Sequence, residues 1–227
     1  MSAAKRIKVT IDGIEVSVPE GTSIWDAARQ AGIDIPVLCH SPRLRPVGVC
    51  RMCVVDIGQR VMAASCVRLC EDGMKVDASS PKVQKHRKML TQLLLSDYPE
   101  KSQRELKTGD DQLLALARRF GIERIPFADG AATGGRGSDS SSPVIDVDHQ
   151  ACILCDKCLR GCNELQHNDV ITRTGKGYTA RIAFDLNAPM GDSTCVSCGE
   201  CMAVCPTGAL TNKPVAPVGA GRRGANR

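Results

Sequence analysis

Thirteen cysteines are the residues of this 227-residue sequence whose type and spacing could do chemistry. Thiolate sulfur is a ligand of zinc and of iron–sulfur clusters, and thiols can also pair as disulfides. The cysteines are clustered along the chain, whereas a dispersed disulfide framework would scatter them. No Ser-His-Asp constellation, paired carboxylates or phosphate-binding glycine loop accompanies them. The sequence therefore predicts metal centres, and no catalytic site in this chain alone.

The C-terminal cysteines form two runs with one spacing, C-x2-C-x2-C-x3-C. The runs are Cys152, Cys155, Cys158 and Cys162, then Cys195, Cys198, Cys201 and Cys205. The spacing resembles that of bacterial two-cluster ferredoxins, in which the fourth cysteine of a run ligates the other cluster. This resemblance implies one [4Fe-4S] cluster on Cys152, Cys155, Cys158 and Cys205, and a second on Cys162, Cys195, Cys198 and Cys201. A zinc site typically needs only two cysteines from each run and is the less favoured alternative.

A second set of cysteines lies in the N-terminal third of the chain. It consists of Cys39, Cys50, Cys53 and Cys66. Four thiolates with a central C-x2-C and a distant last ligand suit one [2Fe-2S] cluster, although plant-type clusters begin C-x4-C-x2-C. Cys70 is then left over, and we expect it to be a bystander, because a free cysteine is commonly just a small hydrophobe.

Histidines and arginines adjoin the predicted ligands. His40 and His149 could each hydrogen-bond near a cluster, but a surface or locally satisfied histidine is the default interpretation. Arg43, Arg45 and Arg51 flank the N-terminal set, where they could offset negative charge or meet an acidic partner. Trp25 is expected to be a packing residue.

Residues 1–79 have the pattern of a β-grasp domain. Apolar residues alternate over 7–11 and again over 14–18, with Asp12-Gly13 as a hairpin turn. A helix is expected after Ser23, with Asp26 in its first turn and Gly32 at its end. Further strands are expected over 33–37, 53–57, 61–64 and 74–76.

Residues 80–128 are predicted to be a helical connector, and 129–143 a flexible linker. Pro81 suits a first helical turn; apolar residues lie near one face of this helix, and the others carry the basic residues Lys82, Lys85, Arg87 and Lys88. A second helix is expected over 110–120. The segment 129–143 is rich in Gly and Ser, and the tail 212–227, which has the same character, is expected to be disordered.

Residues 144–211 are predicted to form a ferredoxin-like domain with two [4Fe-4S] clusters. The pattern indicates a strand over 144–147, a helix over 156–165, a hairpin of 170–171 with 178–184, and a helix over 199–204. The fold class is therefore α+β, with a [2Fe-2S] β-grasp domain, a short helical segment and this second domain.

The text around the cysteines resembles known proteins. LCHSPRLRPVGVCRMCVVDI (38–57) resembles the [2Fe-2S] domain of the large iron–sulfur subunit of complex I, which also opens formate dehydrogenase α-subunits and the diaphorase iron–sulfur subunit of NAD-reducing hydrogenases. CNELQHNDVI (162–171), GKGYTARIAFD (175–185) and PMGDSTCVSCGECMAVCPTGAL (189–210) resemble the NAD-dependent formate dehydrogenase α-subunit most closely.

This sequence differs from the formate dehydrogenase α-subunit in two ways. The connector of that subunit carries a further cluster on one His and three Cys, but residues 96–112 have no such ligands here, and Tyr98 stands where the His would be. Its molybdenum- or tungsten-binding domain would begin where this sequence ends, at Arg227. The resemblance therefore implies an electron-transfer subunit between a Mo/W-pterin catalytic subunit and an FMN/NAD-binding diaphorase subunit.

Net charge and hydropathy argue against two other classes of protein, those that bind nucleic acids and those that span membranes. The net charge of +5 is a mild excess that predicts no nucleic-acid partner, and no apolar run is long enough to span a membrane. No secretory signal is visible, so we expect a cytoplasmic protein. The alternatives are a subunit of an NAD-reducing hydrogenase or complex I-like enzyme and, from another class, a free-standing redox sensor or a zinc-stabilised binding module.

Overall fold

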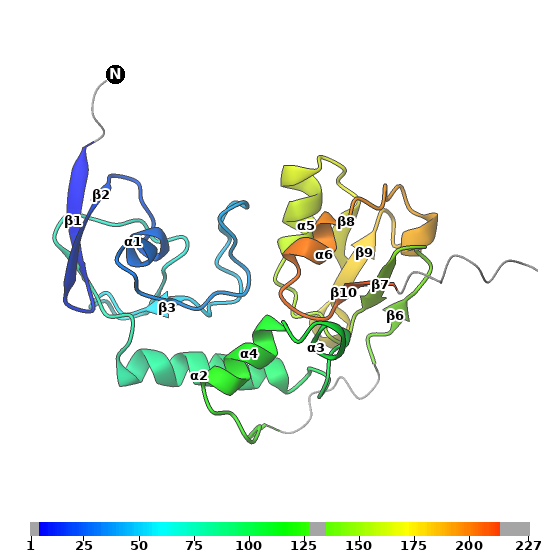
Figure 1. The fold of residues 1–227 in the computed structure, drawn as a ribbon, viewed down its shortest axis with the longest axis horizontal. Coiled ribbons are helices and arrows are strands. Elements are labelled where there is room, and N and C mark those ends of the chain that lie inside the picture. The colour runs from blue at the N-terminus through cyan, green and yellow to red at the C-terminus, as the bar shows by residue number, and fades with distance from the viewer. Residues whose placement is uncertain (1–4, 128–134, 214–227) are drawn as a thin grey trace, which may run out of the picture.

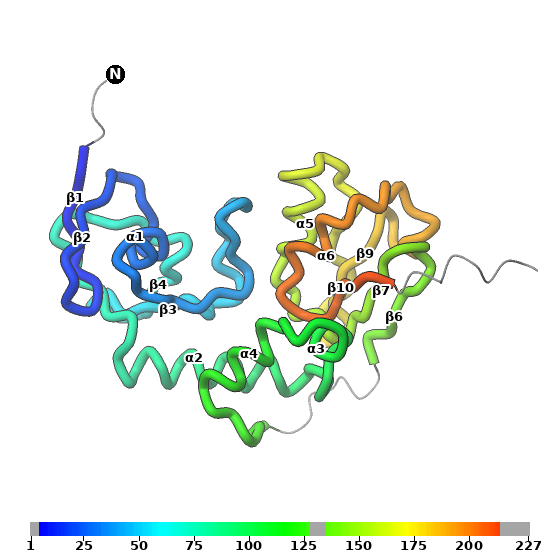
Figure 2. Tube along the Cα trace, viewed as in Figure 1, coloured from blue at the N-terminus to red at the C-terminus, as the bar shows by residue number. Residues whose placement is uncertain are grey.

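The computed structural model describes residues 5–127 and 135–213. Two halves that contain small sheets lie side by side, and the helices of the middle of the chain run beneath both (Figure 1). The trace in Figure 2 follows the chain through the N-terminal half, along these helices and into the C-terminal half. Parts of the expected linker and of the expected tail fall in 128–134 and 214–227, outside the described residues.

A three-stranded sheet of order β2-β1-β5 forms the N-terminal half. β1 and β2 are antiparallel and β5 is parallel to β1, with the bounds Arg6–Ile11, Ile14–Pro19 and Met74–Val76. Alternate residues of β1 are buried, as the period of two predicts. Asp12 and Gly13 both have positive φ, which suits a tight hairpin turn. The hairpin prediction is confirmed.

Helix α1 (Ile24–Gln30) follows β2 and packs into the same core. The Ser23 hydroxyl accepts a hydrogen bond from the Asp26 backbone N–H at 3.1 Å, which is the predicted N-cap. The chain leaves the helix through Gly32, whose φ of +75° is easy only for glycine. The predicted helix and both of its ends are confirmed.

The remaining strands of this half are shorter than expected. β3 (Val54–Val55) and β4 (Ala63–Ala64) form one small antiparallel pair. The segment 33–37, expected to be a strand, is irregular. Pro36 lacks an N–H and restricts Ile35, whose carbonyl instead accepts a hydrogen bond from the Trp25 indole at 3.0 Å.

Three helices connect the two halves: α2 (Pro81–Leu95), α3 (Gln103–Lys107) and α4 (Gln112–Arg119). Ser80 caps α2 and Pro81 occupies its first turn, as predicted. α4 begins two residues later than expected because the Asp111 carboxylate is its N-cap and accepts the N–H of Leu113 at 3.0 Å. α3 was not anticipated; at five residues it is too short for a periodic pattern.

Arg87 lies elsewhere than the sequence pattern implied. It was grouped with the basic residues away from the apolar face of its helix, but only 1% of it is exposed. Its guanidinium donates to the Val54 carbonyl at 2.7 Å and to the Ala78 carbonyl at 2.9 Å. Through these two hydrogen bonds, the face of α2 that carries Arg87 packs against the N-terminal half.

A buried polar cluster fastens α3 and α4 to the C-terminal half. The Asp111 carboxylate is fully buried and accepts hydrogen bonds from the hydroxyls of Tyr98 and, at 2.5 Å, Ser102. The Tyr98 hydroxyl in turn accepts the N–H of Gly208 at 3.2 Å. A Cβ at Gly208 would lie 2.5 Å from the Ser102 Cβ, so this close approach requires glycine.

We expect Asp111→Ala to destabilise the chain by about 3 kcal/mol, because it leaves several buried donors unsatisfied and removes a helix cap. Asp110→Ala is the matched control: its neighbouring carboxylate pairs with Arg104 but is largely exposed, so about 0.5 kcal/mol is expected. Urea denaturation monitored by circular dichroism measures both. Equal losses from the two variants would contradict the assignment of this cluster as a structural tie.

The C-terminal half contains a sheet of order β10-β7-β6 and a separate hairpin of β8 and β9. The strands are β6 (Ser138–Asp139), β7 (Ile145–Asp148), β8 (Ile171–Thr174), β9 (Arg181–Phe184) and β10 (Leu210–Asn212). The helical segments are α5 (Lys157–Arg160), the π-helical η2 (Gly161–Leu165), the short 3-10 turns η3 (Gly177–Thr179) and η4 (Met190–Asp192), and α6 (Glu200–Val204). The expected elements are present with shifted ends, the helix predicted over 156–165 is divided into α5 and η2, and β10 was missed.

The Gly/Ser-rich segment is not a free linker in its described part. Ser138 and Asp139 form strand β6 on the edge of the sheet, paired with β7. The Asp139 carboxylate accepts the N–H of Met190 at 2.6 Å and of Ser141 at 2.8 Å. Because polar contacts hold this segment, its lack of apolar residues gave no sign that it contains a strand. Among the helices of the described ranges, none is long and apolar enough to cross a membrane.

Candidate iron–sulfur sites

The four N-terminal cysteines come together at the edge of their half of the molecule. The Cys53 and Cys66 sulfurs lie 3.4 Å apart, and the Cys39 N–H donates to the Cys50 sulfur at 3.4 Å. β3 and β4 supply the framework, since Cys53 directly precedes β3 and Cys66 follows β4. The structure thus brings together the residues predicted to hold a [2Fe-2S] cluster.

The four thiols of this set shift one another's pKa. Hydrogen bonds from Cys50 and Cys66 lower the pKa of Cys39 to about 2, and a hydrogen bond from Cys66 lowers that of Cys53 to about 6. The same bonds, with burial, raise the pKa of Cys50 and Cys66. The four thiols are therefore close enough to exchange hydrogen bonds, as ligands of one centre must be.

Two polar side chains beside this set have no hydrogen-bond partner among the described residues. They are His40, through both ring nitrogens, and the Ser65 hydroxyl, and all of these atoms are buried. A buried polar atom without a partner is costly. Sulfide and thiolate sulfurs of a cluster would supply acceptors, so these residues fit the group; the surface interpretation of His40 is wrong.

In the C-terminal half, Cys205 acts on cysteines of both runs. Negative charge on Cys205 raises the pKa of both Cys152 and Cys155, after the larger effect of burial. Burial with the charges of Cys155, Cys152 and Cys205 raises that of Cys158 as well. Cys205 also raises the pKa of Cys201, and Cys201 that of Cys158, so the four sulfurs of each crossed set stay a prediction from the ferredoxin spacing.

The other three cysteines of the second run lie together. Burial, then the charges of Cys195 and Cys198, raise the pKa of Cys201 to about 12. Cys162 is on η2, which approaches α6 so closely that a Cβ at Gly161 would lie 3.2 Å from a Val204 methyl. Glycine therefore lets the last residue of the first run reach the helix that carries the second.

The two runs share a backbone conformation between their cysteines. Leu154 and Asp156 flank Cys155 with positive φ, and Ser197 and Gly199 flank Cys198 in the same way. Non-glycine residues rarely adopt positive φ, and such residues gather at functional sites. Arg51, between Cys50 and Cys53, has a φ of +57° as well. The internal duplication seen in the sequence is thus also a duplication of loop geometry.

The loop that carries Cys39 and Cys50 docks against the C-terminal half. Arg43 pairs with Glu200 at 3.2 Å, and Arg45 pairs with Glu164 at 3.3 Å. The acidic partner expected for these arginines therefore lies within the same chain. Arg51 instead donates to the Met62 carbonyl at 3.0 Å.

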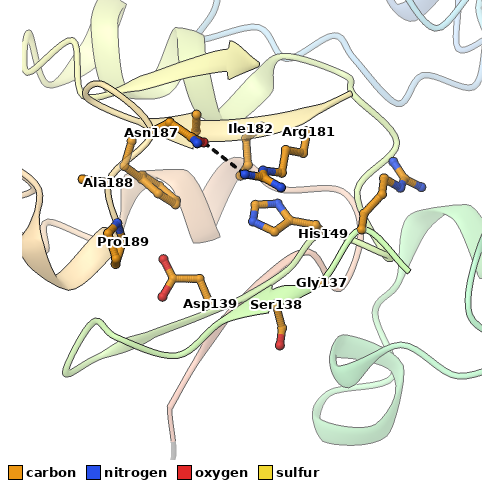
Figure 3. Close-up of a pocket in the computed structure, with 12 residues that line it drawn as sticks. Gly137, Ser138, Asp139, His149, Arg181, Ile182, Asn187, Ala188 and Pro189 are labelled. Carbon is orange, nitrogen blue, oxygen red and sulfur yellow. Dashed lines mark hydrogen bonds between the residues drawn. The ribbon is translucent and has the colours of Figure 1, made fainter. Parts of the chain in front are cut away.

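The pocket in Figure 3 lies away from the cysteine sulfurs, between β6 and β9, and has a volume of about 320 Å³. Arg181 donates to Asn187 there at 3.2 Å, and Arg136 donates to the Cys152 carbonyl at 2.8 Å. His149 lies in this pocket, buried rather than on the surface, with Nδ1 unpartnered among the described residues. The hydrogen bond from Arg136, which lines the pocket, thus holds the loop at the start of the first cysteine run.

Within the described ranges, no three His, Cys, Asp or Glu side chains are grouped as ligands of one metal ion.

Comparisons with known proteins agree with these two cysteine regions. Residues 4–81 match the 2Fe-2S iron-sulfur cluster binding domain family, and residues 144–209 match the 4Fe-4S dicluster domain family. The chain therefore combines a 2Fe-2S ferredoxin domain with a 4Fe-4S dicluster domain. Cys70 lies within the first match but outside the predicted ligand set.

Similarity to several known proteins extends over most of this chain. The NADP-reducing hydrogenase subunit HndD of Solidesulfovibrio fructosivorans is 39% identical over 90% of the chain, and an NADH-quinone oxidoreductase subunit of Rhizobium meliloti is 33% identical over 92%. A chain in the crystal structure of an NAD+-reducing [NiFe]-hydrogenase superposes with a TM-score of 0.83 and 27% identity, covering 93% of this chain and 89% of that one.

The chain is thus related to the iron–sulfur subunits of NADH-quinone oxidoreductases and NAD-reducing hydrogenases. It spans only 36% of the hydrogenase subunit and 24% of the quinone oxidoreductase subunit. The activities of those longer proteins are theirs, and a formate dehydrogenase assignment for this chain remains a proposal.

Proposed function

We propose that this chain is the electron-transfer subunit of an NAD-linked, multi-subunit oxidoreductase. It would hold one [2Fe-2S] cluster on Cys39, Cys50, Cys53 and Cys66, and two [4Fe-4S] clusters on the crossed sets of the C-terminal half. The observation that carries this proposal is the meeting of three cysteine sets in one chain, with the N-terminal loop docked against the C-terminal half by two ion pairs. The β-grasp and ferredoxin-like folds of the two halves, and the domain limits 79/80 and 143/144, belong to the same proposal.

The clusters would supply single-electron chemistry, and the residues of the chain would hold and insulate them. Burial of most of the cysteines keeps water from the sulfurs, which affects the reduction potential. Cys198 is exposed and Cys50 is half-buried. The sites that contain these two cysteines therefore come near the surface, where electrons could enter and leave through partner subunits.

The partners are an FMN/NAD-binding diaphorase subunit and a metal-containing catalytic subunit. A nickel-iron partner is favoured by the similarity to a chain of an NAD+-reducing [NiFe]-hydrogenase, which covers 93% of this chain. The second candidate is a Mo/W-pterin subunit, favoured by the resemblance of residues 162–210 to formate dehydrogenases. A cytoplasmic location is part of both proposals.

Elemental analysis of the native complex, purified without oxygen, tests these proposals. We expect about ten irons in each copy of this chain, from one two-iron and two four-iron clusters. Nickel in the complex would select the hydrogenase type, and molybdenum or tungsten the formate dehydrogenase type. A chain that carries iron but copurifies with no other subunit would indicate a free-standing carrier or sensor. Stoichiometric zinc without iron would refute electron transfer.

A further inference from the structure

Three basic side chains of the described residues are buried: Arg87, Lys157 and Arg160. None of them forms an ion pair with a carboxylate in the described part of the chain, where the ion pairs are mostly at the surface. Among residues 5–127 and 135–213, the one buried carboxylate, Asp111, accepts hydrogen bonds from Tyr98 and Ser102. A buried charge without a counter-charge costs several kcal/mol in general, so something else must compensate these cations.

Each of these cations lies beside a predicted cluster ligand in the chain or contacts the backbone of one or of its neighbour. Arg87 donates to the carbonyl of Val54, the residue after Cys53. Lys157 is the first residue of α5 and lies between two predicted ligands, Cys155 and Cys158. Arg160 lies in the same helix between two predicted ligands, Cys158 and Cys162. An anionic cluster at each predicted site would supply the missing counter-charge at these three positions.

Arg160 is the one that reaches both halves of the molecule. One arm of its guanidinium donates to the Cys39 carbonyl and the other to the Arg45 carbonyl, while its Nε donates to the Asp156 carbonyl of its own helix at 3.2 Å. Only 8% of the residue is exposed. The residue therefore joins a predicted [2Fe-2S] ligand to the helix that carries predicted [4Fe-4S] ligands.

We propose that Arg160 is a positioning residue for electron transfer between the [2Fe-2S] site and the [4Fe-4S] site of Cys152, Cys155, Cys158 and Cys205. It fixes the Cys39 carbonyl against α5 and places one buried positive charge between the two sites. This inference rests on the proposed electron-transfer function. In each transfer one electron leaves one site and enters the other, with no bond made or broken, and its source and destination are the substrates of the partner subunits.

The charge has a direct consequence for redox equilibrium. A [2Fe-2S] cluster with four thiolates has a net charge of about −2 when oxidised, and reduction adds one more negative charge. A cation in a low-dielectric position stabilises the reduced form more than the oxidised form, and thereby raises the potential. Because Arg160 lies between two sites, it raises both potentials.

Redox titration of the full-length chain with its clusters, followed by electron paramagnetic resonance, tests this proposal. At the wild-type midpoint potential of each site, we expect Arg160→Met to lower the ratio of reduced to oxidised cluster about tenfold at both sites, which corresponds to about 59 mV for one electron. Arg160→Lys retains the charge and should restore most of the wild-type ratio. Arg160→Gln retains an amide donor for the Cys39 carbonyl but loses the charge, and should behave like Arg160→Met.

Two control variants separate local charge from general disturbance. Arg45→Met removes an arginine from the same interface, but this side chain is 81% exposed and solvent screens its charge, so the ratios should change less than about twofold. Arg87→Met should shift the [2Fe-2S] site alone. Unchanged midpoints in Arg160→Gln, or equal shifts of all sites in Arg87→Met, would overturn the role of Arg160. Absence of the cluster signals from the wild-type chain would instead refute the proposed function.

Discussion

Cys66→Ser should abolish the spectrum of the [2Fe-2S] site, while Cys70→Ser leaves it intact. The Cys66 sulfur lies 3.4 Å from that of Cys53, within the set that is predicted to bind the cluster. Loss of one thiolate leaves an iron incompletely ligated, and we expect about two of about ten irons to be lost per chain. Visible absorption and electron paramagnetic resonance at temperatures that separate the cluster types measure the loss, and iron analysis counts it.

Cys70 is a closely matched control for this experiment. Both thiols are buried in the same hydrophobic core, four positions apart, so each substitution places a hydroxyl in apolar surroundings. Burial raises the pKa of Cys70, which favours an inert neutral thiol over a reactive thiolate. Equal loss of signal in the two variants would show that destabilised folding, and not ligation, controls the spectrum. An undiminished signal in Cys66→Ser would remove Cys66 from the ligand set.

The sequence was most informative where one residue type has one use. The cysteine spacing predicted the N-terminal set, whose thiols lie together in the structure, because cysteines have few uses besides metal ligation in such clusters. The turn at Asp12-Gly13 and the cap at Ser23 were equally readable, since both depend on local backbone geometry.

The misplaced features depend on contacts between distant segments. Arg87 looked like part of a basic surface because only the carbonyls of Val54 and Ala78 make its burial possible. Likewise, β6 is held by the Asp139 carboxylate and by pairing with β7, which composition does not reveal. The ion pairs of Arg43 and Arg45 could have been anticipated from charge alone, but only the fold identifies Glu200 and Glu164 as their partners.

Cys205→Ser should remove the same four-iron cluster as Cys158→Ser, although the two residues come from different runs. The spacing of two-cluster ferredoxins assigns Cys205 to the site of Cys152, Cys155 and Cys158, and negative charge on Cys205 raises the pKa of all three thiols. If both residues ligate one cluster, the second substitution removes no further iron. The double variant should therefore lose about four irons, as each single variant does.

A second double variant completes the test of this pairing. Cys205→Ser combined with Cys198→Ser affects both proposed [4Fe-4S] sites, so about eight irons should be lost and only the [2Fe-2S] signal should remain. If each run instead held its own cluster, these two residues would serve one site, and the results of the two double variants would be exchanged. The [2Fe-2S] signal is the internal control in every case, because its predicted ligands lie in the other half, around β3 and β4. Crossed ligation would also make the two [4Fe-4S] sites depend on one packed unit, since η2 and α6 must touch at Gly161 and Val204 for either set to be complete.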